Sequence, residues 1–458
     1  MRSTSADNGG SAAAGISDVL RLAWPSVLSF VCNGLYRVND QYWIRGLGPD
    51  AQAALGGSFF ILVLNFALYF LAVAGSLTLI ARATGARDEA DRETTIRHSL
   101  VLGGGLAVLL SLAGPWIVPF VIESLGFAGD TARLGSEYLS TMYLFALPMA
   151  MAPLVDTIFI GMGNTRVPLL LTSVAVSLNF ALNPCLIYGW GPFEARGMAG
   201  AALATAVSRG LAVVIGLLIL RLRFQVIPWR TLKIQTSRLL QIARIGLPNS
   251  VSIGCYAVVY VALYRWVLSG LGRDVMAGLS IGFNAFEGIS FPFFLGVSIA
   301  GSSLVGRNLG AKAPELALLA VRNTRRVGGV TGLIFALIFW FVGPWLVPAF
   351  TDDAGVSREA ILYIQLLAFS QLFVAYETVG EKVLLGSGHT SPIFWVSVPG
   401  NALRVPLGWF MATHLGMGAA GVWWSINITT LMKAAAFTWL VQRGDWLHRE
   451  PGAPESEP

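Results

Sequence analysis

Long apolar stretches recur along the whole chain, and each has the length of a helix that crosses a lipid bilayer. A membrane-spanning helix needs about 20 mostly apolar residues. Twelve segments of this kind occur, at 17–44, 54–80, 98–121, 134–160, 167–189, 199–220, 241–268, 278–304, 327–349, 359–385, 392–414 and 419–441. They are too long and too uniformly apolar for the strands of a membrane barrel. The sequence therefore predicts an all-α polytopic membrane protein with twelve transmembrane helices.

Composition excludes a soluble fold. Only 12% of the residues are charged and 55% are hydrophobic, whereas a soluble domain carries about 25% charged residues. A soluble protein could not bury so much apolar surface. The three cysteines, Cys32, Cys185 and Cys255, lie inside predicted spans at unrelated positions, which indicates small packing residues rather than disulfides or a metal motif.

The sequence also contains an internal repeat. Gly114–Pro119 returns as Gly343–Pro348, and Gly161–Thr165 returns as Gly386–Thr390, an offset of 386 − 161 = 225 residues. Each copy holds six spans, an even number, so both copies enter the membrane in the same orientation. Such parallel repeats are typical of secondary transporters, whose binding sites lie between the halves.

The repeat sets the expected domain limits. Pro25 in the first span matches Pro248 in the seventh, and each proline is expected to kink its helix. The predicted segments are a disordered cytoplasmic N-terminus at 1–16, an N-lobe at 17–220, a cytoplasmic connector at 221–240, a C-lobe at 241–441 and a cytoplasmic tail at 442–458.

The net charge of +6 reflects membrane topology and not nucleic-acid binding. The opposite loops carry few basic residues, most of them beside acids. Cytoplasmic loops of membrane proteins are enriched in Lys and Arg, so the basic loops are predicted to be cytoplasmic, together with both termini. These loops hold Arg82, Arg87, Arg92, Arg97, Arg221, Arg223, Arg230, Lys233, Arg238, Arg244, Arg307, Lys312, Arg322, Arg325 and Arg326.

Several motifs resemble those of the multidrug and toxic compound extrusion (MATE) family over roughly residues 18–440. The first span ends in an Asp, an apolar run and Leu-Gly, and a Gly-x-Gly-x-Thr turn precedes the fifth and eleventh spans. The segments that carry the resemblance are Val38–Gly48, Ala83–Ala86, Gly161–Thr165, Asn179–Pro184, Gly306–Ala311, Gly386–Thr390 and Asn401–Pro406.

The resemblance implies two parallel six-helix lobes that form a V-shaped cavity and alternate between outward-open and inward-open states. It implies export of organic cations and other small molecules in exchange for H⁺ or Na⁺, without a cofactor. The expected setting is a bacterial inner (plasma) membrane, with the lipid bilayer and small-molecule cations as partners, and the expected state is a monomer.

Acidic residues inside predicted spans are the first candidates for a site, since a charge in the hydrocarbon costs about 2.5–3.5 kcal/mol on insertion scales. Asp40 lies toward the outer end of the first span, where the resemblance places the N-lobe ion site. Burial disfavours its charged form and so favours proton uptake; a bound Na⁺ near Asp40 is the alternative. The other interpretation is an interfacial Asp that is simply solvated or paired.

Four polar residues are expected around Asp40. Asn33 and Tyr36 lie seven and four residues before it, on the same helix face, and by resemblance Asn179 and Asn183 line the same site. Arg37, three residues before Asp40, either points elsewhere or forms an ion pair that favours the charged carboxylate.

In the C-lobe, Glu287 and Glu377 are the candidate ion-coupling acids, and a structural bond to a partner helix is the competing role. Arg404, near Asn401, is expected to pair with one of them. Asp156 and Glu381 are repeat partners, since 381 − 156 = 225, and are predicted to form a gate or to pack helices.

Departures from the family leave the coupling ion open. Branches of the family carry an acid where this chain has Asn183, Val374 or a residue near Ala257, and none of these is acidic here. Na⁺ and H⁺ therefore both remain possible.

Other functions fit the sequence less well than transport does. A flippase for lipids or lipid-linked oligosaccharides has a related architecture, but such relatives usually have fourteen spans and a more basic cavity. A receptor or channel fits the acidic spans and the duplication less well. An enzyme is not expected, since the four histidines lie at helix ends, in loops or in the tail, and the absence of a nucleotide-binding Gly-Lys-Ser/Thr loop favours an ion gradient over ATP.

Overall fold

The computed structural model describes residues 14–124, 127, 129–226, 234–351 and 353–448. Every regular element in these ranges is helical. Eight helices are long and apolar enough to span a membrane, and a ninth span results if α4 and α5, bent by 56° at Phe145, are counted together. The other three predicted spans correspond to α1, to α14 with α15 and η6, and to α16. The predicted all-α membrane fold is therefore confirmed. The predicted termini, 1–16 and 442–458, and the predicted connector, 221–240, lie partly outside the described residues.

The chain divides into two compact units, which differ in outline from the predicted lobes. We call Leu28–Ser250 the N-unit, and Met1–Val27 with Val251–Pro458 the C-unit. The predicted lobe limits, 17–220 and 241–441, remain a prediction from the sequence repeat.

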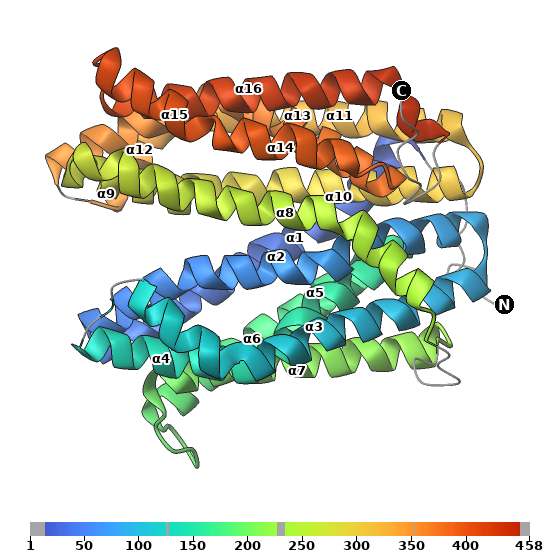
Figure 1. Cartoon of the computed structure of the whole chain (residues 1–458), viewed down its shortest axis with the longest axis horizontal. Coiled ribbons are helices and arrows are strands. Elements are labelled where there is room, and N and C mark those ends of the chain that lie inside the picture. The colour runs from blue at the N-terminus through green and yellow to red at the C-terminus, as the bar shows by residue number, and fades with distance from the viewer. Residues whose placement is uncertain (1–13, 125–126, 128, 227–233, 352, 449–458) are drawn as a thin grey trace. The chain divides into compact units, whose positions relative to one another are not determined.

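The N-unit contains most of the first half of the chain, and its helices run alongside one another (Figure 1). It holds the second part of α1 and the first part of α8, which are divided between the units. The elements are α1 (Ile16–Ile44), η1 (Arg45–Leu47), α2 (Pro49–Ala86), α3 (Glu89–Ser124), α4 (Gly129–Leu144), α5 (Ala146–Gly161), α6 (Arg166–Tyr188), α7 (Gly197–Arg223) and α8 (Thr236–Trp266).

The C-unit repeats this plan with more interruptions. Three of its spans contain π-helical turns, which widen a helix locally and re-aim its side chains. After α8 come η2 (Leu268–Gly270), α9 (Arg273–Ile281), the π-turn η3 (Gly282–Glu287), α10 (Gly288–Gly310), α11 (Pro314–Leu337), the π-turn η4 (Ile338–Val342), α12 (Gly343–Leu346), η5 (Val347–Ala349), α13 (Ala354–Ser387), α14 (Ser391–Ala402), α15 (Arg404–Trp409), the π-turn η6 (Phe410–His414), α16 (Ala419–Arg443) and η7 (Asp445–Leu447).

The two divided helices change partners just after a proline. The boundaries at Val27 and Ser250 each come two residues after the repeat-matched Pro25 and Pro248. Before the first boundary, Ala14 accepts a hydrogen bond from the Asn323 amide at 2.7 Å. Up to the second boundary α8 packs in the N-unit, where the Ser250 hydroxyl donates to the carbonyl of Ala67 at 2.7 Å. The expected kink positions therefore mark where each helix passes from one unit to the other.

Close helix contacts in the N-unit depend on glycine. A β carbon at Gly200 would lie 2.6 Å from the carbonyl carbon of Leu186 and 3.0 Å from the amide nitrogen of Ile187. Those atoms belong to backbone, which has little freedom to move aside. Gly200 therefore lets α7 approach α6, in the same region that supplies the polar site described below.

We expect Gly200→Ala to destabilise the protein by about 1–3 kcal/mol, the usual effect of overpacking. Gly105→Ala is the matched control, because nothing lies within 4 Å of the added carbon and alanine favours a helix by up to about 1 kcal/mol over glycine. Thermal unfolding in detergent micelles measures both. Equal Tm values for the two variants would show that α6 and α7 are less closely packed than described.

Candidate functional site

The carboxyl group of Asp40 lies at a meeting point of three N-unit helices. Asp40 is only 6% exposed. The Asn183 amide on α6 donates to its Oδ1 at 2.8 Å, and the Thr205 hydroxyl on α7 donates to its Oδ2 at 3.4 Å. Both donors are uncharged, so the carboxyl group is held by hydrogen bonds and makes no ion pair among the described side chains.

A second row of amides supports this arrangement. The Asn39 amide donates to Oδ1 of Asn179 at 2.8 Å, and the Asn179 amide donates to the Thr205 hydroxyl at 3.1 Å. Asn179 and Asn183 are four residues apart and share one face of α6. Both are fully buried. The structure thus brings Asp40, Asn179 and Asn183 together, as expected from the sequence; their role in ion coupling stays a prediction.

The other expected partners of Asp40, Tyr36 and Asn33, lie nearer the start of α1. The Tyr36 hydroxyl is 3.3 Å from the Ser208 hydroxyl, and the Asn33 amide donates to the Ser29 carbonyl at 3.1 Å. Neither forms a hydrogen bond with Asp40 in the described part of the chain. The side chain of Arg37 lies outside the described residues, so its predicted pairing with Asp40 stays a prediction.

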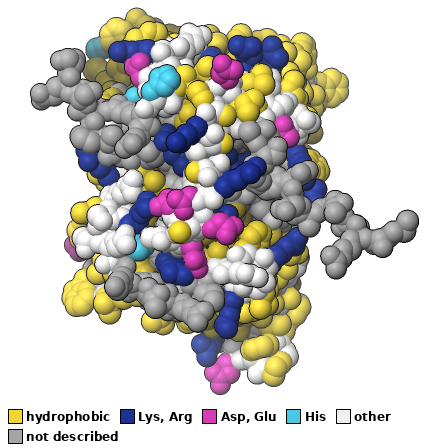
Figure 2. Space-filling view, turned by 90° about the vertical axis from the view of Figure 1, so that its right-hand side faces the viewer, with side chains coloured by type: hydrophobic (Ala, Val, Ile, Leu, Met, Phe, Trp, Pro, Cys, Tyr) yellow, Lys and Arg dark blue, Asp and Glu magenta, His cyan; other side chains and the backbone are white. Residues whose placement is uncertain are grey.

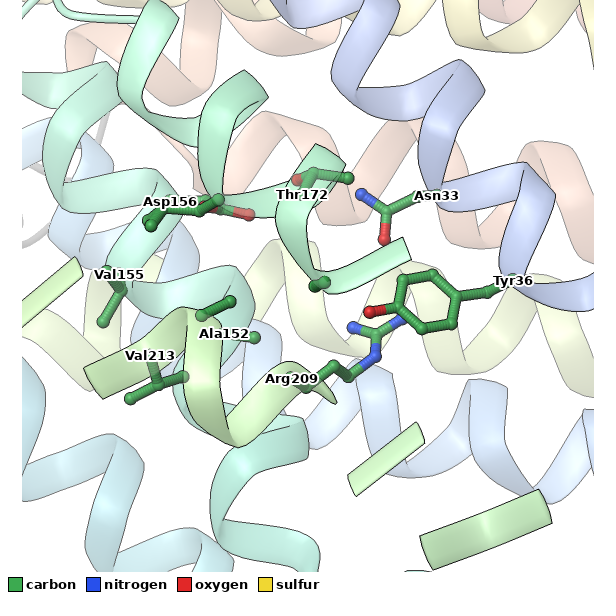
Figure 3. A pocket seen from close by; sticks show the side chains of 11 residues that line it. Asn33, Tyr36, Ala152, Val155, Asp156, Thr172, Arg209 and Val213 are labelled. Atoms are coloured by element: carbon green, nitrogen blue, oxygen red, sulfur yellow. The ribbon is translucent and has the colours of Figure 1, made fainter. Parts of the chain in front are cut away.

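Tyr36 and Asn33 instead line a small cavity, whose other polar lining residues are Asp156 of α5, Thr172 of α6 and Arg209 of α7. The Arg209 guanidinium carbon is 4.8 Å from the centre of the Tyr36 ring. Figure 3 shows Arg209 beside Tyr36, with Asp156 on the other side of the cavity. Asp156, predicted as a gate or packing residue, therefore lines a small cavity together with these polar side chains.

Three residues of α7 escaped the sequence analysis: Thr205, Ser208 and Arg209. A signal for them was present, because Arg209 is the single charged residue between 199 and 220. Their spacings of three and four residues place them on one helical face. A basic residue that interrupts an apolar span is as strong a candidate for a functional site as an acidic one.

A buried ion pair lies in the C-unit. The ammonium group of Lys433 on α16 donates to Oε1 of Glu377 on α13 at 2.7 Å and to Oδ1 of Asn401 on α14 at 2.8 Å. The side chains of Lys433 and Glu377 are 5% and 16% exposed. Lys433, the only charged residue between 419 and 441, is a second residue that the sequence analysis missed. Near the end of α13, Glu381 pairs with Lys382 at 2.6 Å.

Arg404 does not make the ion pair expected of it. Its guanidinium group donates to three hydroxyl groups, those of Thr429 at 3.2 Å, Tyr260 at 3.2 Å and Thr430 at 3.4 Å. Lys433 takes the place beside Glu377 that the sequence analysis proposed for Arg404. The difference arises because α16 presents its lysine to α13 and α14, while Arg404 faces hydroxyl groups of α8 and α16.

Glu287 lies at the end of the π-turn η3. Its Oε1 accepts a hydrogen bond from the Tyr363 hydroxyl on α13. A β carbon at Gly282, the first residue of the same turn, would clash with the Tyr363 ring, whose Cε1 atom would lie 2.5 Å away. The absence of a side chain at Gly282 therefore admits the tyrosine that holds Glu287.

Metal binding by several acids or histidines has no support in the described residues, where no group of three or more His, Cys, Asp or Glu is close enough to hold an ion. Among the described residues, Asp40 is the only carboxylate in the network that it forms with Asn183, Thr205 and Asn179. A cation there would depend on amide and hydroxyl oxygens for its remaining ligands.

Comparisons with known proteins place the chain in a family. The MatE family model matches residues 25–185 and 251–410, more than half of the chain. A probable multidrug resistance protein NorM of Pseudomonas syringae is 26% identical over 435 residues, covering 92% of this chain and 93% of that protein. Its namesake in Pseudomonas aeruginosa is 28% identical over 447 residues, covering 93% of this chain and 89% of that protein.

Solved structures show the same fold. A MOP superfamily transporter from Pyrococcus furiosus, described as having a binding pocket of reverse polarity, matches with a TM-score of 0.88 at 22% identity, over 96% of this chain and 98% of that one. An outward-facing multidrug resistance MATE transporter matches with a TM-score of 0.87 at 22% identity, over 95% and 97% of the two chains. From the family match and the helical repeat, we conclude that this chain is a multi-pass membrane protein that belongs to the MatE family of multidrug efflux transporters.

Proposed function

We propose that the protein is a proton-coupled antiporter that exports amphipathic, often cationic, small molecules by alternating access of two six-helix lobes. The family and the multidrug resistance names of its relatives support the transport class. The observation that carries the coupling proposal is the Asp40 carboxyl group, which is buried in a membrane helix and is held, among the described side chains, by uncharged donors. Such a group gains a proton readily, because a lone charge in that setting is costly.

The hydrogen bonds around Asp40 suit both of its protonation states. As a carboxylate, it accepts from Asn183 and Thr205. As a carboxylic acid it must donate, and the Oδ1 atoms of Asn183 and Asn39 are buried acceptors without a donor in the described structure. Rotation of the Asn183 amide would turn its oxygen toward the acid, because an amide offers a donor and an acceptor on opposite sides. Protonation then requires only a local change.

A second candidate is Na⁺ coupling, since the same amide oxygens are possible ligands for a hard cation. Proteoliposomes loaded with ethidium, a planar organic cation, separate the two when a pH gradient and a Na⁺ gradient are imposed one at a time. We expect efflux under the pH gradient at zero Na⁺. Efflux that responds only to the Na⁺ gradient would show that the coupling ion is Na⁺. The assignment of the protein as a transporter would still hold.

We further propose that both termini and the basic loops are cytoplasmic, in a bacterial inner membrane. Figure 2 shows a face on which Lys and Arg side chains gather with Asp and Glu. Among the described residues of the predicted cytoplasmic loops, Arg238 pairs with Asp91 and Arg97 pairs with Glu93 at 2.5 Å. A cysteine introduced at an exposed residue of these loops should react with an impermeant thiol reagent only after the cells are opened.

A flippase for lipid-linked oligosaccharides is less favoured. Such a substrate carries phosphate groups, which require basic side chains with free donors. Among the described residues of the C-unit, the two most buried cationic groups, Arg404 and Lys433, already donate to protein hydroxyl, amide and carboxylate oxygens.

A further inference from the structure

The cavity beside Asp156 is small, has polar and apolar lining residues, and lies close to the Asp40 site within one compact unit. Its volume is about 20 Å³, and about 10–15 Å³ is enough for one ordered water if polar partners surround it. Five of the residues that line it have polar side chains, namely Asp156, Arg209, Tyr36, Asn33 and Thr172. A water molecule therefore has both the room and the partners to occupy it.

One wall atom lacks a partner. The Nε atom of Arg209 is buried and has no hydrogen-bond acceptor in the described structure. A buried donor left in this state costs about 1–3 kcal/mol, and a water in the cavity would satisfy it. The same water could donate to Asp156, which has no hydrogen-bond or ion-pair partner within the described ranges.

Three hydroxyl groups, interrupted by the backbone carbonyl of Thr205, lie between the cavity and Asp40. Thr205 donates to Asp40, Ser208 donates to the carbonyl of Thr205 at 3.0 Å, and the Ser208 and Tyr36 hydroxyls are 3.3 Å apart. Tyr36 lines the cavity and lies one helical turn before Asp40, a rise of about 6 Å at 1.5 Å per residue. The cavity thus begins one turn from the carboxyl group proposed to carry the proton.

The direction of this row agrees with the proposed topology. With the N-terminus in the cytoplasm, Tyr36 and Asn33 lie on the cytoplasmic side of Asp40 along α1. Asp156 is five residues from the cytoplasmic end of α5 at Gly161, about 8 Å along the helix axis. On α7, which runs the opposite way to α1 in this topology, Arg209 likewise lies nearer the cytoplasm than Thr205.

We propose that Asp156 is a second proton-carrying carboxyl group of the transport cycle, which receives the proton of Asp40 through water in this cavity and passes it to the cytoplasm. The O–H bond of Asp40 breaks and an O–H bond forms on Asp156, while the water and hydroxyl groups between them gain and lose one proton each. This inference rests on the proposed proton-coupled function.

The groups that face Asp156 fix its expected behaviour. Arg209 of α7 is the cation of the cavity, and Tyr36 of α1 is its other titratable group, with Asp40 one turn beyond. The lining residues of α6 are uncharged, and among the described residues α2, α3 and α4 contribute none to the wall. Arg209 stabilises the charged form of Asp156. Asp156 is therefore deprotonated between transfers and can accept the next proton.

The test compares Asp156→Asn with the double variant Asp156→Asn/Arg209→Gln in ethidium-loaded proteoliposomes. We expect both to lose pH-driven efflux about tenfold or more, as when a proton-transfer group is removed, and Asp156→Glu to restore most of it. Ethidium binding in detergent, and the proton release that accompanies it from Asp40, should persist in both variants. The double variant also removes the buried positive charge of Arg209, so an Asp156 that only balanced this charge would give near-normal transport in the double variant, and this result would overturn the inference.

Failure of the proposed function is recognised separately. If wild-type protein shows neither pH-driven efflux nor proton release on ethidium binding, the coupling proposal itself is wrong and the relay falls with it. If wild-type protein shows both and Asp156→Asn retains its pH-driven rate between pH 6 and 8, only the relay is wrong.

Discussion

We expect Asp40→Asn to abolish pH-driven efflux in proteoliposomes, with a loss of at least about tenfold and a rate close to that of empty vesicles. Asparagine keeps the size of aspartate and its hydrogen bond from Thr205, but it cannot bind and release a proton. The Asn183 amide can rotate to meet the new side chain. The protein should therefore fold and still bind ethidium, so that binding and coupling separate in one variant.

Asp130→Asn is the matched control for this change. Asp130 is an exposed acid that pairs with Arg133 at 3.1 Å, and surface pairs contribute less than about 1 kcal/mol. Its efflux should equal that of the wild type. Undiminished pH-driven efflux by Asp40→Asn, with the imposed gradient verified by a pH-sensitive dye, would exclude Asp40 as the coupling group.

The largest effect on stability is expected at the buried pair of Lys433 and Glu377. Removing one member of a buried ion pair costs about 3–5 kcal/mol, because the other charge stays buried without compensation. Glu377→Gln leaves Lys433 with Asn401 as its remaining partner, and Lys433→Met leaves Glu377 with none among the described side chains. Lys433→Met should therefore be the more harmful of the two. Chemical unfolding in mixed detergent micelles measures both.

The double variant Glu377→Gln/Lys433→Met distinguishes a structural pair from a functional one. Two neutral side chains remove the buried charges together, so most of the lost stability should return. The exposed pair of Arg133 and Glu137, 2.8 Å apart, provides a control in which the same changes cost less than about 1 kcal/mol. If the double variant regains its stability but still fails to transport ethidium, Glu377 acts in the transport cycle as predicted. If the stability lost in the double variant equals the sum of the losses in the two single variants, the pair does not form.

Much of the fold could be predicted from residue types and their spacing. Helix is the only spanning element that satisfies its own backbone hydrogen bonds in lipid, so apolar stretches of about 20 residues indicate both the element and its environment. The repeat at an offset of 225 residues indicated two related halves. Kinks were expected at the prolines at 25 and 248, and the structure divides α1 and α8 between the compact units two residues after each of them. The breaks inside spans were not foreseen, because π-turns such as η3 depend on neighbours such as Tyr363.

The sequence by itself determined that this is a helical membrane protein with acids placed inside its spans, since hydropathy and charge are local properties. Only the tertiary structure decided which polar groups meet. Thr205 reaches Asp40 from 165 residues away, and Lys433 takes the partner that had been expected for Arg404. The physical reason is that such contacts depend on how each helix is rotated against its neighbours, which the packing of all side chains sets together.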